Sequence, residues 1–155
     1  MHYWLMKSEP DVFGIDHLAK APKLTVSWGG VRNYQVRNLL RDEIKLGDQA
    51  LFYHSSCPQP GVVGVMEVTG AAHPDPTQFD TADEYYDAKA TRAKPIWYAV
   101  DVTLAERFET PVFLQELRDS AALKTLQILR RGNRLSITPV TAAEWNAILK
   151  LAHTK

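Results

Sequence analysis

Cysteine is nearly absent from this 155-residue chain, and the single Cys57 excludes an intramolecular disulfide and any metal site built from several cysteines. The sequence also lacks an excess of either charge, because 18 lysines and arginines balance 18 aspartates and glutamates. Proteins that bind long nucleic acids without regard to sequence usually carry a clear basic excess, so this balance argues against such binding. It still permits a pocket that binds one nucleotide.

The sequence contains no basic and apolar leader, no apolar run long enough to cross a membrane and no internal repeat. We therefore expect a soluble protein of the cytoplasm that makes no membrane contact. A chain of this length can bury a core without help from metals, so residues 1–155 are predicted to form one domain. The oligomeric state is left open.

Signatures of common active sites are missing too. No GxSxG nucleophile motif is present, and the five histidines lack the spacing of metal ligands, so we expect neither a metal nor a cofactor. His54 and Ser55 are neighbours, but adjacent strand residues point to opposite faces. A catalytic function is therefore an alternative interpretation only.

Apolar and alternating stretches, separated by turn residues, predict six strands and several helices. The strands are expected at residues 2–7, 24–28, 50–55, 62–68, 96–104 and 135–137, with the third and fourth forming a hairpin. Helical segments are expected after Gly30, from Thr110–Pro111 to Arg118, at 121–129 and after the capping box that begins at Thr141. This order predicts an α+β fold, a small mixed β-barrel of about five to six strands with helices packed around it.

The stretch from Trp28 to Ser56 is the most informative part of the chain. Gly29 and Gly30 permit a sharp turn, and an amphipathic basic helix is predicted to follow them. The free N–H groups at the start of that helix could receive an anion, with Arg32, Arg37, Arg41 and Lys45 adding positive potential. The alternative is an ordinary surface helix whose arginines are solvated.

Trp28 precedes the glycines, where its ring could act as a platform on which a nucleobase stacks. Polar groups at two predicted strand ends could form the rim of the same pocket: Lys7, Ser8 and Glu9 after the first strand, and Tyr53, His54 and Ser55 at the end of the third. Each group could instead simply cap a turn or meet solvent.

A long polar segment, residues 72–95, separates the fourth and fifth predicted strands. Connections of this length are usually functional or disordered. Phe79, Tyr85 and Tyr86 could make it a lid that brings a second aromatic ring to the pocket, or these rings could fasten the segment to the sheet.

Several motifs, in order and over nearly the whole chain, resemble the EVE domain family: MHYWLMKSEP, WGGVRNYQVRNLLR, GDQALFYHSS, PGVVGVMEV, HPDPTQFD, PIWYAVDV and RGNRLSITPVT. Family members usually have WDGVRNYQARN, so Gly29 replaces an acidic residue and Val36 an alanine. The resemblance implies a PUA-like fold, related to the YTH domains, and recognition of a modified base such as modified cytosine. Lys7, Ser8 and Trp28 look like the pocket elements of the YTH relatives.

We therefore expect a module that binds DNA or RNA carrying a modified base, with a methylated base as the leading candidate, without cutting it. The predicted base pocket comprises Lys7, Ser8, Glu9, Trp28, Asn33, Tyr53, His54 and Ser55, and the predicted phosphate contacts are Arg32, Arg37 and Arg134. A protein-interaction module that uses the polar segment, or a small enzyme acting on a nucleotide-like ligand, is the alternative.

Overall fold

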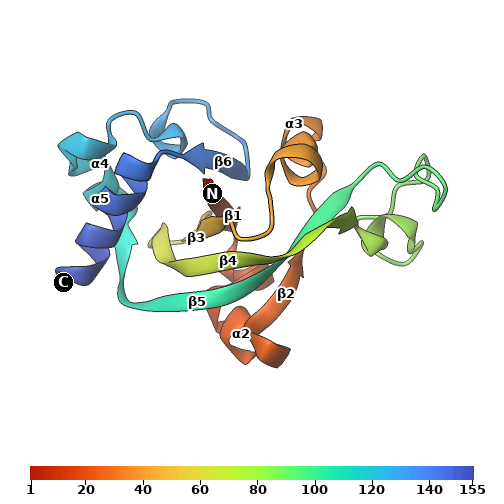
Figure 1. Cartoon of the computed structure of the whole chain (residues 1–155), viewed down its shortest axis with the longest axis horizontal. Helices are drawn as coiled ribbons and strands as arrows, with labels where there is room; N and C mark the ends of the chain where they lie inside the picture. The colour runs from red at the N-terminus through yellow and green to blue at the C-terminus, as the bar shows by residue number, and fades with distance from the viewer.

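All six predicted strands are present in the computed structural model, which describes residues 1–155, and they form one mixed sheet (Figure 1). The strand order is β2-β5-β4-β3-β1-β6, with β1 parallel to β3 and the other neighbours antiparallel. The strands are β1 (Tyr3–Ser8), β2 (Thr25–Trp28), β3 (Gln49–His54), β4 (Gly61–Pro74), β5 (Tyr98–Phe113) and β6 (Ile137–Val140).

The helices are short, apart from the last one. The α-helices are α1 (Pro10–Phe13), α2 (Ile15–Lys20), α3 (Tyr34–Asn38), α4 (Leu114–Asp119) and α5 (Ala142–His153). A π-helical turn, η2 (Leu39–Glu43), extends α3, and single 3-10 turns lie at η1 (Pro22–Leu24), η3 (Pro76–Phe79), η4 (Ala121–Leu123) and η5 (Gln127–Leu129).

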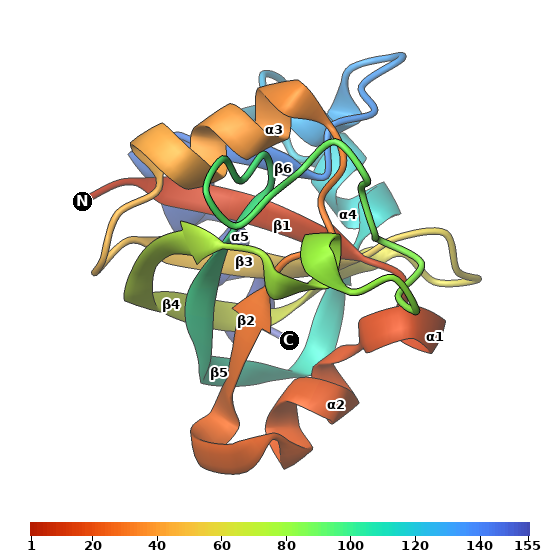
Figure 2. The ribbon, with the colours of Figure 1, turned by 90° about the vertical axis from the view of Figure 1, so that its right-hand side faces the viewer.

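The α+β class and the mixed sheet are confirmed, but the sheet does not close into a barrel. β2 and β6 are its two edges and do not pair with each other. Its curvature comes from the long pair β4 and β5, where several register shifts bend the strands. Figure 2 shows the curled sheet, with α3 at the top of the view and α1 and α2 at its lower right.

Strand alternation divides the core into two clusters, one for each face of the sheet. Met6 and Phe52 belong to the larger cluster, together with Trp28, whereas Leu5 and Leu51 belong to the smaller one, together with Trp145 of α5. Adjacent strand residues point to opposite faces, so every strand except β2 contributes to both clusters.

Two predicted helices are present only in part. The helix expected from Thr110–Pro111 begins only at Leu114, because β5 continues to Phe113. Pro111 lies in β5 between the paired residues Arg107 and Val112, where the register shifts. The sheet needs no hydrogen bond from an N–H group at this position, so proline is tolerated there. The helix expected at 121–129 is reduced to two separate 3-10 turns.

The predicted start of the last helix is confirmed. The Thr141 side chain accepts a hydrogen bond from the N–H of Glu144, and the Glu144 carboxylate accepts one from the N–H of Thr141. These reciprocal bonds satisfy N–H groups that a helix start leaves without partners. α5 then packs against the smaller core cluster.

Candidate functional site

A cavity of about 800 Å³, here called the main cavity, opens beside the carboxyl ends of β1 and β3. Its wall comes from four parts of the chain that are distant in sequence. These are residues 7–13, residues 26–33, Ser55 and Ser56, and residues 75–85, with Arg134 and Ser136 completing the rim. This volume lies in the range of small-molecule and cofactor sites and accommodates a nucleotide.

The parallel pairing of β1 and β3 places two of these parts together. Ser8 lies opposite His54 in the register, and the N–H of Ser55 donates to the carbonyl of Ser8 at 3.0 Å. Parallel neighbours end at the same edge of a sheet, so both polar strand ends meet there. Of the eleven predicted site residues, eight line the main cavity: Lys7, Ser8, Glu9, Trp28, Asn33, Ser55, Arg32 and Arg134.

Trp28 is both a wall of the main cavity and a member of the larger core cluster, with only 7% of its surface exposed. Its ring stands edge-on to Phe52, at a centroid distance of 5.2 Å, and to Phe13, at 6.2 Å. Such perpendicular contacts suit the charge distribution of aromatic rings and fix the orientation of the indole. Trp28 is therefore a rigid wall rather than a freely exposed platform.

Phe13 is a cavity residue that the sequence reasoning missed. It lies at the end of α1, stacks with Phe52 at 6.2 Å and also contacts His17 at 5.6 Å. A lone aromatic residue after a proline turn has no local pattern that marks it as a site residue. Tyr85, which was considered as a second ring, does reach the main cavity.

Asp75 is the most enclosed charged group at the cavity wall, with 2% of its surface exposed. One carboxylate oxygen accepts from the Gly30 N–H at 2.7 Å and from Arg32 at 3.1 Å, while the other accepts from the N–H and hydroxyl of Thr77. Burial alone would raise the pKa of Asp75, but these hydrogen bonds outweigh it and hold the pKa below its ordinary value. Asp75 is thus a fixed anion.

Arg32 uses all five of its N–H groups within the protein. They donate to Asp75, to the hydroxyl of Thr77, twice to the carbonyl of Tyr85 and to the carbonyl of Val31. The guanidinium also lies 5.3 Å from the Tyr85 ring centre and 5.2 Å from that of Trp97. No donor of Arg32 is free, so the predicted phosphate contact of Arg32 would require it to exchange one of these hydrogen bonds. Arg32 instead fixes the 75–85 wall.

The glycine step binds an anion that the protein itself provides. Gly30 has a φ of 73°, a conformation that glycine adopts without strain, and its N–H points to Asp75. A Cβ atom at position 29 would lie 2.8 Å from the Asp75 carboxylate, so Gly29 allows that carboxylate to approach. The expected free helix start is also occupied, because the Asn33 side chain accepts from the Val36 N–H at 3.0 Å.

Three predicted site residues do not reach the main cavity. His54 faces the Phe52 side of β3, and its Nε2 accepts a hydrogen bond from the Ile15 N–H at 3.1 Å. Tyr53 points to the other face, into the smaller core cluster. Arg37 donates to the carbonyl of Ile96 at 2.8 Å, which turns it away. Strand alternation separates the first two, and a backbone acceptor captures the third.

The titration of His54 follows from its position. Burial lowers the pKa of His54 below its ordinary value, with a smaller opposing contribution from Asp16. The neutral ring is the form that can accept the Ile15 N–H. His54 therefore supports the link between β3 and α2 rather than ligand chemistry.

Two cations at the main cavity have no ion-pair partner. Lys7 is half-buried and Arg134 is exposed, and neither forms a salt bridge or a side-chain hydrogen bond within the protein. Burial lowers the pKa of Lys7 from its ordinary value. Glu9 is the one carboxylate of the wall besides Asp75, whose charge is balanced by Arg32. The cavity thus combines aromatic walls, hydroxyl groups and available positive charge.

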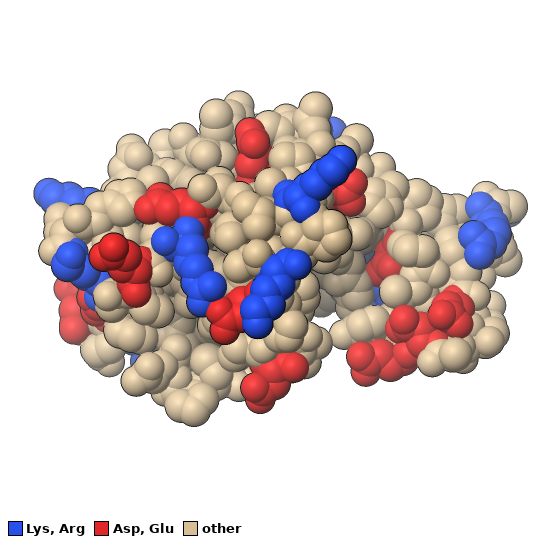
Figure 3. Space-filling model, turned by 90° about the horizontal axis from the view of Figure 1, so that it is seen from below, with Lys and Arg blue, Asp and Glu red and all other residues tan.

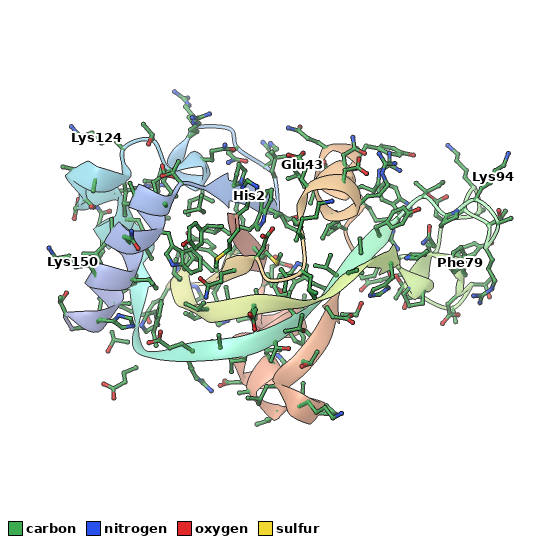
Figure 4. The ribbon with its side chains drawn as sticks, viewed as in Figure 1. His2, Glu43, Phe79, Lys94, Lys124 and Lys150 are labelled. Atoms are coloured by element: carbon green, nitrogen blue, oxygen red, sulfur yellow. The ribbon has the colours of Figure 1, made fainter.

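The polar segment after β4 is ordered by one buried glutamine. Gln78 donates to the carbonyls of Asp75 and Trp97 and accepts from the N–H groups of Ile96 and Trp97. Beyond it, Phe79 and Lys94 lie on the part that projects from the sheet (Figure 4), where Arg92 stacks over the Phe79 ring at 4.9 Å. Of the three rings considered, Tyr85 faces the cavity and Phe79 fastens the segment.

Charge is distributed unevenly over the surface. Figure 3 shows acidic side chains along one edge of the projecting part of the molecule and basic side chains at its end, whereas both signs are interspersed over the main body. No helix is long and apolar enough to cross a membrane. No three histidine, cysteine, aspartate or glutamate side chains are grouped so that they could hold a metal ion.

Comparisons with known proteins place these features in one family. The EVE domain profile matches residues 2–151. Thymocyte nuclear protein 1 of Mus musculus is 40% identical over 171 residues, which cover 99% of this chain and 75% of that protein. The crystal structure of a Pseudomonas syringae protein is 46% identical, with a TM-score of 0.91, over 97% of this chain and 99% of that one.

Two further structures carry information about ligands. Human THYN1 in complex with DNA containing 5-methylcytosine is 38% identical and has a TM-score of 0.93, over 100% of this chain and 99% of that one. The YTH domain of Zygosaccharomyces rouxii MRB1, in complex with N6-methyladenosine RNA, has a TM-score of 0.55 over 97% of this chain and 85% of that one. At 15% identity the YTH domain shows a shared fold only.

Proposed function

Because the chain belongs to the EVE domain family, we propose that it binds a nucleic acid carrying a modified base and holds that base in the main cavity against Trp28, without catalysis. One observation carries the proposal. A rigid tryptophan wall, fixed by two phenylalanines, lies beside the unpaired cations Lys7 and Arg134. An aromatic wall with adjacent positive charge suits a base and its phosphates.

The energetics favour a modified base. Extruding a base from a duplex costs a few kcal/mol, and stacking against one aromatic ring returns about 1 to 3 kcal/mol. A methyl group buried against the apolar wall formed by Phe13, Val26 and Val31 adds about 0.8 kcal/mol, which corresponds to roughly a fourfold gain in affinity. Hydroxyls of Ser8 and Ser55 and the amide nitrogen of Asn33 are available for the polar edge of the base.

The human relative bound to DNA with 5-methylcytosine makes that base the first ligand to test. RNA remains an alternative form of the same ligand, because a pocket for a base edge does not by itself exclude a 2′-hydroxyl. Asp75 and Arg32 are unsuited to proton transfer, because Asp75 accepts four hydrogen bonds and Arg32 donates five.

We also propose that residues 1–155 form one EVE domain and that the protein is located in the cytoplasm. The vertebrate relatives carry the word nuclear in their name, so the compartment needs its own measurement. Fractionation of cells that produce the tagged chain provides it.

The test is fluorescence anisotropy of labelled single-stranded oligonucleotides that contain one central cytosine, either plain or 5-methylated, in DNA and in RNA. We expect the methylated member to bind about fourfold more tightly. Equal affinity for plain and methylated members in both series would contradict the proposal. Mass spectrometry of the recovered oligonucleotide distinguishes binding from chemistry, since an altered mass indicates an enzyme.

Trp28→Ala should weaken binding by at least about fivefold through lost stacking. Because Trp28 also belongs to the core, Trp28→Phe is the second variant: it keeps a ring, and should keep most binding while abolishing the quenching of tryptophan fluorescence by the ligand. Tyr34→Ala is the matched control, since Tyr34 is a 56% exposed aromatic residue outside the cavity. Full affinity in folded Trp28→Ala would remove Trp28 from the proposal.

A further inference from the structure

A second, smaller cavity of about 220 Å³, here called the side hollow, lies next to the main cavity. The two share three wall residues, Lys7, Ser55 and Ser56. The remaining wall of the side hollow consists of Tyr53, Pro60, Leu114, Arg118 and Ile128. Because Lys7 and the two serines border both spaces, one ligand can reach from one into the other.

The side hollow has the chemistry of an anion site. Lys7 and Arg118 bring two positive charges, and neither forms an ion pair within the protein. No carboxylate lines the hollow. The hydroxyls of Ser55 and Ser56 add two further donors that make no hydrogen bond elsewhere. Arginine and hydroxyl donors are the groups that most often contact phosphate oxygens.

Tyr53 provides an independent observation. The residue is 95% buried, with 5% of its surface exposed, yet its hydroxyl has no hydrogen-bond partner in the protein and is not among the enclosed unsatisfied groups. The hydroxyl therefore opens to the side hollow. Arg118 lines the same hollow, and its charge opposes the rise that burial causes in the pKa of Tyr53. A hydroxyl that lines a hollow and has no partner in the protein is free to bond a ligand or a water.

We propose that the side hollow binds one phosphate of the nucleic acid backbone, next to the base in the main cavity, through Lys7, Tyr53 and Arg118. This inference rests on the proposed function for the identity of the ligand. It assigns to Tyr53 a phosphate contact in place of the base contact predicted from the sequence. It also adds Arg118, which no sequence pattern indicated.

Variants and modified ligands can separate the contributions of the base and of the phosphate to the binding affinity. Arg118→Gln and Tyr53→Phe each remove one donor, and Tyr53→Phe keeps the ring that packs in the smaller core cluster. Arg41→Gln is the matched control, because it makes the same change in net charge at an exposed arginine outside both cavities. Binding is measured for the oligonucleotide with one 5-methylcytosine, for the 5-methylcytosine nucleoside alone, and for the oligonucleotide with an uncharged methylphosphonate next to the modified base.

We expect Arg118→Gln to weaken binding of the charged oligonucleotide about tenfold, with unchanged binding of the nucleoside and little effect on the methylphosphonate. The slope of log affinity against log salt should fall by about 0.7 for this single strand. Arg41→Gln should leave affinity within twofold. If Arg118→Gln and the unchanged protein bind the charged oligonucleotide equally, with equal salt slopes, the assignment is wrong.

A failure of the proposed function gives a different result, namely that no oligonucleotide or nucleoside binds the unchanged protein. Inorganic phosphate is then titrated while the NMR signals of the Ser55 and Ser56 amides are followed. If phosphate shifts these signals in the unchanged protein but not in Arg118→Gln, the side hollow is an anion site that binds free phosphate. If phosphate causes no shifts, the side hollow is not an anion site.

Discussion

The substitution Asp75→Asn tests whether a fixed anion holds the cavity wall together. The carboxylate accepts two hydrogen bonds on each oxygen, from Gly30 and Arg32 on one side and from Thr77 on the other. An asparagine replaces one acceptor oxygen by an NH₂ donor. The hydroxyl of Thr77 can rotate and accept, so the new NH₂ group should face Thr77 and leave its backbone N–H without a partner.

The expected cost has two parts. An unpaired buried N–H costs about 1 to 3 kcal/mol, with the lower end fitting the half-buried Thr77, and the bonds from Gly30 and Arg32 lose the part of their strength that the negative charge provides. The Arg32 side chain is 22% exposed, so solvent weakens its electrostatic attraction to Asp75. We therefore expect the free energy of unfolding to decrease by about 3 kcal/mol in total. For a chain of this size the decrease corresponds to a fall in Tm of roughly 6 to 12 °C.

Thermal and urea unfolding measure this decrease, with Asp42→Asn as the control. Asp42 is exposed and bonded to the neighbouring Arg41, so its replacement should leave Tm unchanged. A Tm for Asp75→Asn within about 2 °C of the unchanged protein would refute the reasoning, because it would mean that the four hydrogen bonds add little.

The pH dependence gives the same prediction a second readout. The pKa of Asp75 is lower in the folded protein than in the unfolded chain, so its contribution is complete above a pH of about 4 and is lost as the pH falls through the folded pKa. The stability difference between the two proteins should therefore shrink below about pH 4. A constant difference down to pH 2 would show that charge is not its source.

Two other predictions concern the scaffold. Burial lowers the pKa of His54, so the unfolded chain takes up the proton at a higher pH than the folded one; the free energy of unfolding should fall as pH decreases below about 6.5. His54→Gln, which keeps an acceptor for Ile15, should show a weaker dependence in urea titrations from pH 7 to 5, and an identical dependence would contradict this role. Thr141→Ala should lower the free energy of unfolding by about 1 kcal/mol through loss of the helix cap, whereas Thr154→Ala, at an exposed helix end, should have no measurable effect. Equal denaturation midpoints for these two variants would count against the cap.

Local patterns in the sequence were sufficient for much of the fold. The aromatic and apolar run of β1, the β3–β4 hairpin and the capping box at Thr141 each depend on residues close together in the chain, and all three are confirmed. Pro111 misled because proline suits both a helix start and an irregular strand, and only the pairing with β4 decides between them.

The site was predictable where it follows from strand ends and not where it depends on tertiary partners. Ser8 and Ser55 were expected at a rim because they end strands, and the parallel pairing brings them together. The fate of Arg32 depends on Asp75 and Tyr85, which lie more than forty residues away, so no local pattern could show that its donors are occupied. For Tyr53, alternation alone could not decide which face of the sheet holds the ligand.

The parallel pairing of β1 and β3 has a consequence for how the protein reaches its folded state. Parallel neighbours cannot be joined by a tight turn, so the chain must travel back along the sheet between them, and that return path contains α1, α2, β2, Trp28 and α3. The part of the cavity wall that lies between Glu9 and Asn33 is therefore built from the connection itself. Closing so long a loop is slow, since its entropy is lost before its contacts form. Trp28 fluorescence should thus report a late step in refolding, after the local β3–β4 hairpin has formed.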